Sequence, residues 1–348
     1  MAKRFHLALL FLLLLCQGTA CAQPPATQPT ATSVRHKPWV LISTDIGGSD
    51  PDDKQSMAHA LLYADRLHFV GLVSTPTRHG GRASDLLEVI AAYEKDYPNL
   101  KTWSADYPTP AYLRSIVHQG QIEPQPPEGF SAQSSPGTDA IVQAAYRARE
   151  AGRPLWVLVW GAATDLAQAL HTDPRIVTVL RVYSIGDWNT EQDRAARDYI
   201  HRHHPALWWI ENDSSFRGLY IDENGRDNNG WRMEDARGHG ALGEYFVAAR
   251  PWGLKMGDTP SLLYLIDHAD DGDPTADSWG GSFIRDPMRP QRWIDDPDRR
   301  LDIAGYAGAE TIRRFQAAIY RDIAARFDRA RAPRSPGTPL AASARPGG

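Results

Sequence analysis

Cysteine is scarce in this sequence of 348 residues: there are two, Cys16 and Cys21, and both lie near the start of the chain. Residues 36–330 contain none, which excludes disulfide bonds as a stabilising framework for that segment. The segment must therefore be held together by a hydrophobic core, and it is long enough to form one. It is compatible with one large domain or two smaller ones.

Clusters of basic residues are also lacking. The 38 Lys and Arg residues are outnumbered by 42 Asp and Glu residues, and no stripe of positive charge stands out. Because proteins that bind nucleic acid need a basic surface to neutralise phosphates, we expect no nucleic-acid partner. No internal repeat is found either, which excludes a solenoid.

Only one long apolar run occurs, at residues 7–15, and it is preceded by two basic residues and followed by small ones. It is too short to cross a bilayer, so we expect a signal peptide at residues 1–22 and no transmembrane helix. The protein is then secreted or periplasmic. A lipoprotein anchor at Cys21 is the alternative, which is less favoured because Gly18 stands where an aliphatic residue is usual.

Two further segments lack the periodicity of helices and strands. Residues 23–35 are rich in Pro, Thr and Ala and indicate a flexible linker. Residues 331–348 have the same character and indicate a disordered tail. The folded part is therefore expected at residues 36–330.

The folded part shows an alternation of strand and helix patterns. Short, almost continuously apolar runs, typical of strands buried on both faces, occur at residues 38–44, 67–74, 154–160, 178–185 and 206–210. Helical spacing is found at residues 52–64, 84–97 and 307–327, whereas residues 101–136 and 267–293 have the pattern of loops. This order predicts an α/β fold with a doubly wound, mostly parallel sheet.

Polar residues follow the predicted strands. Asp45 comes after the first strand, Asp187 and Asn189 after the fourth, and Glu211 to Asp213 after the fifth. In open parallel sheets this edge is where ligands bind.

Four carboxylates lie within nine residues at the first of these strand ends: Asp45, Asp50, Asp52 and Asp53. Two carboxylates about 4 Å apart repel by roughly 4 kcal/mol at an effective dielectric constant of 20. A site that gathers several of them needs a cation, so the segment predicts a divalent metal site. Asp50, beside Pro51, is more typical of a turn residue than of a ligand.

Three segments resemble one family. Asp45, Gly47, Asp52 and Asp53 match an Asp-x-Gly-x-Asp-Asp motif with an insertion, Gly161 to Asp165 match Gly-x-Leu-Thr-Asn, and Gly257 to Pro260 match His-Asp-Pro. Residues 38–266 thus resemble the calcium-dependent, inosine-uridine preferring nucleoside hydrolases. They resemble more closely the nucleoside hydrolase-like domain of secreted bacterial proteins linked to carbohydrate breakdown.

The resemblance implies a Ca²⁺ site formed by Asp45, Asp53 and Asp258 with a main-chain carbonyl near Ala163. Asp52 would hold ribose-type hydroxyls, and a metal-bound water aligned by Asp45 would attack the anomeric carbon, which makes Asp45 and Asp52 the catalytic residues. Oxygen ligands suit Ca²⁺, a bound cation lowers the pKa of water, and carboxylates stabilise an oxocarbenium-like transition state. Asp258 could alternatively cap the helix that follows it.

Further substrate contacts are implied at the positions that match the family's sugar-binding residues: His79, Glu211, Asn212 and Asp213. Trp279, in a Trp-Gly-Gly segment, is either a stacking platform for sugar rings or a buried corner. The family's acid for the departing base is a His, and this chain has Gly257 there.

Histidines elsewhere could replace that acid: His79, His118 and His239 are the candidates. His201, His203 and His204 are spaced so that a helix would point them to different faces, which favours a solvated helix end over a metal cluster.

These features predict a secreted, Ca²⁺-dependent hydrolase of N- or O-glycosidic bonds that acts on a small molecule or an oligosaccharide. The alternative is a non-catalytic carbohydrate-binding protein that retains the metal site. An aspartyl phosphatase is disfavoured because the first strand lacks a second Asp two residues after Asp45. A homo-oligomer is compatible with the sequence.

Overall fold

The computed structural model describes residues 37–48, 50–76, 81–125, 129–227, 230–268 and 272–331. The described residues belong to one compact unit. The predicted signal peptide and linker, most of the predicted tail, and His79 lie outside the described residues. Among the described helices, none is both long and apolar enough to cross a membrane.

A single eight-stranded sheet forms the centre of the described part, with the order β3-β2-β1-β4-β5-β6-β8-β7. The strands are β1 (Trp39–Thr44), β2 (His68–Ser74), β3 (Val117–Gln119), β4 (Leu155–Trp160), β5 (Leu180–Ile185), β6 (Trp208–Asn212), β7 (Phe283–Arg285) and β8 (Arg292–Asp295). Neighbouring strands are parallel except β7 and β8. The predicted doubly wound, mostly parallel sheet is confirmed.

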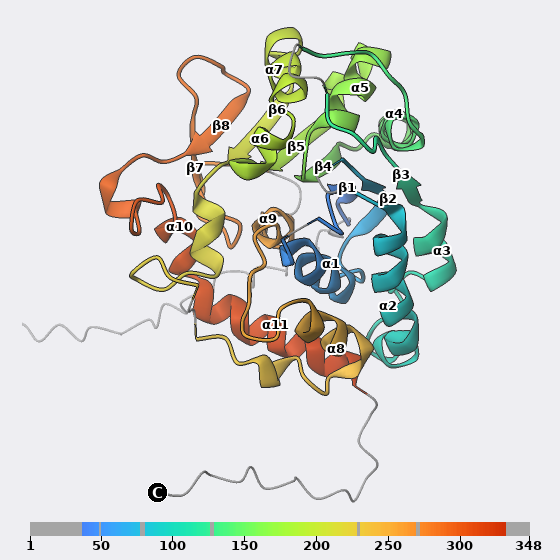
Figure 1. Cartoon of the computed structure of the whole chain (residues 1–348), viewed down its shortest axis with the longest axis vertical. Coiled ribbons are helices and arrows are strands. Elements are labelled where there is room, and N and C mark those ends of the chain that lie inside the picture. Colours follow the sequence, from blue (N-terminus) through green and yellow to red (C-terminus); the bar gives the residue numbers. More distant parts are fainter. Residues whose placement is uncertain are drawn as a thin grey trace, which may run out of the picture. The chain divides into compact units, whose positions relative to one another are not determined.

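The helices cover both faces of the sheet (Figure 1). They are α1 (Asp52–Leu62), α2 (Ala83–Trp103), α3 (Pro110–Ser115), α4 (Pro136–Glu150), α5 (Thr164–Thr172), α6 (Trp188–Gln192), α7 (Arg194–His203), α8 (Gly240–Ala249), α9 (Thr259–His268), α10 (Glu310–Arg313) and α11 (Gln316–Ala330). Short 3-10 helices are η1 (Pro174–Thr178), η2 (Ser215–Leu219), η3 (Met233–Asp235) and η4 (Arg299–Leu301).

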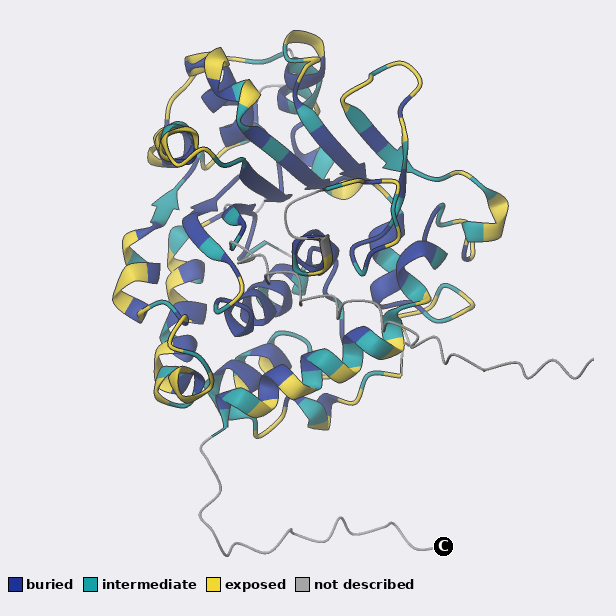
Figure 2. Cartoon of the chain, turned by 180° about the vertical axis from the view of Figure 1, so that it is seen from behind, coloured by how far each residue is buried: buried dark blue, intermediate teal, exposed yellow. Residues whose placement is uncertain are grey.

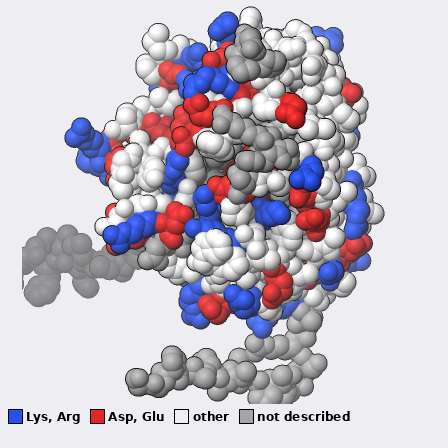
Figure 3. All heavy atoms as spheres, in the orientation of Figure 1, with Lys and Arg blue, Asp and Glu red and all other residues white. Residues whose placement is uncertain are grey.

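Alternation along the strands divides the core in two. Val40 and Ile42 of β1 pack with α1, α2, α8, α9 and α11, while Leu41 between them packs with α4, α5 and α7. Both faces of the central strands are therefore buried, as Figure 2 shows, which explains why their sequences are almost continuously apolar. On the face seen in Figure 3, acidic and basic side chains are interspersed.

The predicted loops contain structure that the sequence pattern did not indicate. Helix α2 extends to Trp103 with Pro98 inside it, and α3 and β3 follow within residues 101–136. Strand β7 lies within residues 267–293, and β8 begins there. These three strands have three or four residues each and lie near the ends of the sheet, so they carry no long apolar run.

Two other boundaries differ from the prediction. The helix expected at residues 307–327 is interrupted between α10 and α11. Strand β6 runs from Trp208 to Asn212, so Glu211 and Asn212 lie within the strand and not after it. Consecutive strand residues point to opposite faces of a sheet, so Glu211 and Asn212 cannot both face one site.

Candidate metal and substrate site

A cavity of about 100 Å³ lies at the carboxyl ends of β1 and β5. Its acidic lining residues are Asp45, Asp50, Asp52, Asp53, Asp187 and Asp258. Two cationic side chains, Arg217 and Lys255, also line it, together with the turn that follows β5. The structure therefore brings together all four of the aspartates that the sequence placed in the site, Asp45, Asp52, Asp53 and Asp258, and places the predicted turn residue Asp50 beside them.

The end of β1 is built to place carboxylates in this cavity. Gly47 has a φ of +94°, and a Cβ there would lie 2.4 Å from the Asp85 carboxylate, so this turn requires glycine. The Thr44 hydroxyl donates a hydrogen bond to Asp53 and accepts one of 3.1 Å from the Ile46 N–H. The strand end and the first turn of α1 are thus tied to each other.

Asp258 comes from a distant part of the chain and is fixed from the sheet. The Trp160 indole N–H, at the end of β4, donates to the Ser261 hydroxyl over 2.6 Å. The same hydroxyl donates to the Asp258 carbonyl over 2.7 Å. This chain of hydrogen bonds anchors the start of α9 against the middle of the sheet.

Oxygen atoms of Asp52, Asp53 and Asp258 lie within 4.8 Å of one another. Two full charges at that distance repel by about 3.5 kcal/mol at an effective dielectric constant of 20. Burial, followed by the charges of neighbouring aspartates, raises the pKa of Asp53 and that of Asp258 well above the usual range. Without a cation, the charged form of this cluster is strongly disfavoured.

The donor set fits a hard cation. Asp258 is buried, and its Oδ2 has no hydrogen-bond partner among the described residues. A buried carboxylate oxygen without a partner is costly unless a counter-charge is present. Three converging carboxylates offer the oxygen ligands that Ca²⁺ prefers, whereas softer metals prefer sulfur and nitrogen ligands.

Asp45 lies in the same cavity but is not one of these three residues. Burial raises its pKa to about 6, although a contact with the Asp53 side chain acts in the opposite direction. The cluster contains Asp52 where the resemblance implies Asp45, so the division of ligand and sugar-binding roles between these two residues stays a prediction.

The segment that carries the predicted carbonyl ligand, Ala163, passes close to Asp45 in space, but Ala163 does not line the cavity. The Ala163 carbonyl accepts the Ala167 N–H over 2.9 Å at the start of α5. Gly161 makes the approach of this segment possible, because a Cβ at Gly161 would lie 2.8 Å from the Asp45 Cβ.

Glycine also stands where the family's motif has histidine. A Cβ at Gly257 would lie 2.5 Å from Asp52 Oδ2. Any side chain at this position must therefore displace the Asp52 carboxylate. Of the histidines considered as replacements, His118 is in β3 and His239 contacts Asp328 over 3.2 Å, and neither lines the cavity.

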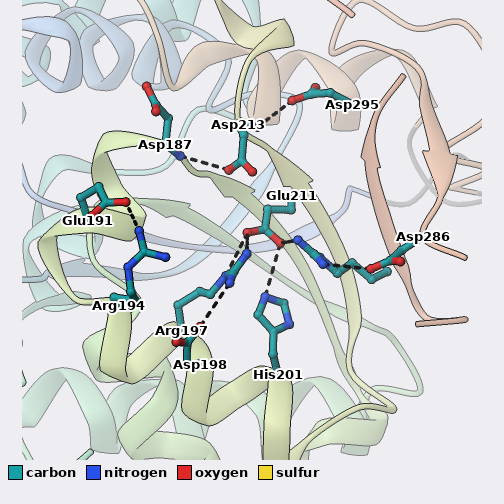
Figure 4. A network of polar contacts seen from close by, with 11 residues as sticks. Asp187, Glu191, Arg194, Arg197, Asp198, His201, Glu211, Asp213, Asp286 and Asp295 are labelled. Atoms are coloured by element: carbon teal, nitrogen blue, oxygen red, sulfur yellow. Dashed lines mark hydrogen bonds and ion pairs between the residues drawn. The ribbon is translucent and has the colours of Figure 1, made fainter. Parts of the chain in front are cut away.

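Glu211 does not line the cavity, and Figure 4 shows its carboxylate directed toward Arg197 and His201 of α7. It is 1% exposed and forms ion pairs with Arg197 and Arg292. His201 Nε2, on α7, lies 3.3 Å from the Glu211 carboxylate, so this histidine is buried and engaged instead of lying at a solvated helix end. Burial alone would raise the pKa of Glu211, but His201 and the two guanidinium groups hold it at about 2.

Asn212 and Asp213 form hydrogen bonds to the backbone of residues that line the cavity. The Asn212 amide donates to the Tyr183 hydroxyl over 2.9 Å, and its oxygen accepts the Phe216 N–H over 2.8 Å. Asp213 accepts the Asp187 N–H over 3.0 Å (Figure 4). Neither residue lines the cavity, so both fix the backbone of residues that do.

Trp279, the predicted stacking platform, is partly buried and packs against the core. The backbone N–H of Trp279 donates to Asp267 Oδ2 over 3.0 Å, and Trp279 does not line the cavity. The aromatic residues that do are Trp188, Phe216 and Tyr220, which sequence reasoning missed together with Arg217 and Lys255. For Lys255 a signal existed: it lies three residues before a matched motif aspartate.

A cavity of convergent carboxylates at the carboxyl edge of a doubly wound sheet defines a ligand-binding α/β protein. Residues 39–283 match the model of the family described as cellulose-binding Sde182, nucleoside hydrolase-like domain. The match covers well over half of the chain, so the chain belongs to this family.

Solved structures agree with this assignment. A nucleoside hydrolase-related hypothetical protein from Saccharophagus degradans, described as associated with carbohydrate metabolism, is 26% identical, with a TM-score of 0.65 over 85% of this chain and 72% of the other. A purine-preferring ribonucleoside hydrolase from Gardnerella vaginalis is 14% identical, with a TM-score of 0.50 over 83% and 99%. The effector protein XOO4466 is 14% identical, with a TM-score of 0.51 over 85% and 94%.

The last two share the fold alone. No protein of curated function matches the chain.

Proposed function

We propose that the protein is an exported, calcium-dependent hydrolase of N- or O-glycosidic bonds, with a sugar-containing small molecule or oligosaccharide as its substrate. The observation that carries this proposal is the convergence of Asp52, Asp53 and Asp258 with an unpaired buried oxygen on Asp258. The apolar segment at residues 7–15 supports export. The family description supports a carbohydrate ligand.

Each aspartate of the cavity has its own role in this proposal. Asp53 and Asp258 would hold the cation together with Asp52 or Asp45. When bound, Ca²⁺ would supply a positioned water of lowered pKa.

Asp45, which lines the same cavity beside Asp53, can accept the proton of an attacking water. Asp52, if it is not a ligand, can accept hydrogen bonds from sugar hydroxyls. The clustered carboxylates would stabilise positive charge at the anomeric carbon.

Metal analysis and a substrate screen test the proposal together. The purified protein should retain stoichiometric Ca²⁺ after dialysis has removed the unbound ion, and Asp53→Asn should lose it. Release of base or reducing sugar from a panel of nucleosides and oligosaccharides should stop with a chelator and return with Ca²⁺. Wild-type protein that binds no Ca²⁺ would contradict the proposal.

A second candidate, a non-catalytic carbohydrate-binding protein that retains the metal, is favoured by one observation. Gly257 packs against Asp52, so no side chain can act as an acid from that position. Calorimetric binding of saccharides without cleavage of any compound in the panel would support this candidate over a hydrolase.

A further inference from the structure

A second recess, of about 250 Å³, adjoins the carboxylate cavity and is lined by Asp50, Pro51, Trp188 and Lys255. Asp50, Trp188 and Lys255 also line the cavity. The two spaces therefore share three lining residues and lie next to each other.

Trp188 is one of these three shared residues, and 51% of it is exposed. It follows Asp187, which has a φ of +52°, a left-handed conformation that costs a non-glycine residue about 1–3 kcal/mol. Three features of the neighbouring residues offset this strain. Asp213 accepts the Asp187 N–H, Arg217 pairs with the Asp187 carboxylate, and Gly186 lacks a Cβ that would lie 1.7 Å from Asp213 Oδ1.

The strained turn fixes the backbone that presents Trp188. Backbone strain of this kind persists where surrounding contacts impose it, and it clusters at binding sites. Arg217 is itself held between the rings of Phe216 and Tyr306, at 4.4 and 4.7 Å from their centroids. The exposed indole is therefore presented by a supported structure.

The polar side of the recess is also fixed. Lys255 pairs with Asp50, and its backbone N–H donates to Gln55 Oε1 over 2.7 Å. Gln55 is fully buried in α1, and its amide donates to the Phe246 and Gly253 carbonyls. Asp50 Oδ1 is buried without a hydrogen-bond partner among the described residues, but 40% of the Asp50 side chain is exposed, so the ion pair offers the recess an acceptor beside a cationic donor.

We propose that this recess is the subsite for the leaving-group unit and that this unit is a sugar ring. The inference rests on the proposed function and deepens it. The apolar face of the ring would stack on Trp188. Its hydroxyls would donate to Asp50 and accept from Lys255.

The composition of the recess favours a sugar over a nucleobase. Flat bases are held by stacking between aromatic or apolar side chains on both faces. Here the lining is one aromatic side chain, Pro51 and an ion pair, and the two charged side chains match the hydroxyls of a sugar ring whose apolar face lies on Trp188. Gly257 has no side chain and lines neither space, so the contacts to the leaving group would come from the residues that line the recess.

The test compares Trp188→Ala with Trp252→Ala, a matched control that removes a tryptophan 77% exposed and outside both spaces. Binding of cello- and xylo-oligosaccharides, of the corresponding monosaccharides and of inosine is measured by calorimetry in Ca²⁺. Trp188→Ala should weaken oligosaccharide binding about tenfold or more. Monosaccharide binding should weaken less than oligosaccharide binding, Ca²⁺ content should not change, and Trp188→Phe should restore most of the loss.

Three outcomes overturn the inference: wild-type protein that binds no oligosaccharide, Trp188→Ala that binds oligosaccharides as Trp252→Ala does, or a loss for inosine equal to that for oligosaccharides. The proposed hydrolase is tested separately, by cleavage. Oligosaccharide binding that depends on Trp188, without hydrolysis, keeps the subsite and excludes the hydrolase.

Discussion

Replacing Asp258 by Asn should stabilise the metal-free protein and abolish its response to calcium. The amide keeps the size of the carboxyl group and removes its charge. Asp258 takes part in two of the three repulsions within the cluster of oxygens that lie within 4.8 Å. Each is worth about 3.5 kcal/mol at full charge and a dielectric constant of 20.

Protonation relieves part of this repulsion in the wild-type protein, because the pKa values of Asp53 and Asp258 are raised. The gain of the metal-free variant should therefore be smaller, about 1–3 kcal/mol.

Calcium should reverse the order of stability. At a free concentration 100 times the Kd, a ligand stabilises the folded state by about 2.7 kcal/mol. For a domain of this size that corresponds to a rise in Tm of about 4 °C. The wild-type protein should show this rise and Asp258→Asn should not. The variant is thus expected to melt higher in chelator and lower in saturating calcium.

Thermal unfolding in EDTA and in a calcium titration checks this, with calcium content measured by elemental analysis. Asp106→Asn is the control, because its carboxylate is 65% exposed and pairs with Lys37 at the surface, where ion pairs contribute about 0–1 kcal/mol. It should change neither melting curve. A variant Asp258→Asn that melts lower in EDTA and still responds to calcium would refute the assignment of Asp258 as a ligand.

Two further predictions concern the residues around the cavity. Glu211→Gln should destabilise the protein by about 3 kcal/mol at pH 7, because the folded-state pKa of about 2 lies below the ordinary 4.5. This contribution is present above pH 4.5 and is lost as the pH falls toward 2, so urea unfolding at pH 7 and pH 3 should show a shrinking difference. An equal difference at both pH values would contradict it. Gly257→Ala should weaken calcium binding about tenfold or more, since its Cβ would lie 2.5 Å from Asp52 Oδ2; unchanged affinity by calorimetry would show that Asp52 moves without cost.

The sheet could be predicted because each of its central strands is buried on both faces. Strands β1, β2, β4, β5 and β6 have apolar runs long enough to be distinguished from helix and loop. Strands β3, β7 and β8 could not be predicted, since three or four residues give no period. Their pairing depends on partners that are already in place.

Asp45, Asp52 and Asp53 could be predicted because they follow the end of a strand or open a helix, whereas Asp258 was predicted from the resemblance of residues 257–260 to the family's motif. Glu211 shows where this reasoning stops. A shift of two residues in the end of β6 places it within the strand, and alternation then turns it to α7 and two arginines. The sequence contains no marker that distinguishes a strand's last residue from the first residue after it.

The remaining part of the site is determined by contacts between loops, which is why Trp188 and Lys255 were missed. The turn that presents Trp188 has its left-handed residue at Asp187, where a sequence reader expects glycine or asparagine. Its stability comes from Asp213 and Arg217, which are 26 and 30 residues away in the chain. The aspartates lie in short segments of the sequence that can be recognised as motifs. Asp50, Trp188 and Lys255 come from three separate segments, so no single motif contains them. The proposed subsite for the leaving group therefore had to be identified from the structure.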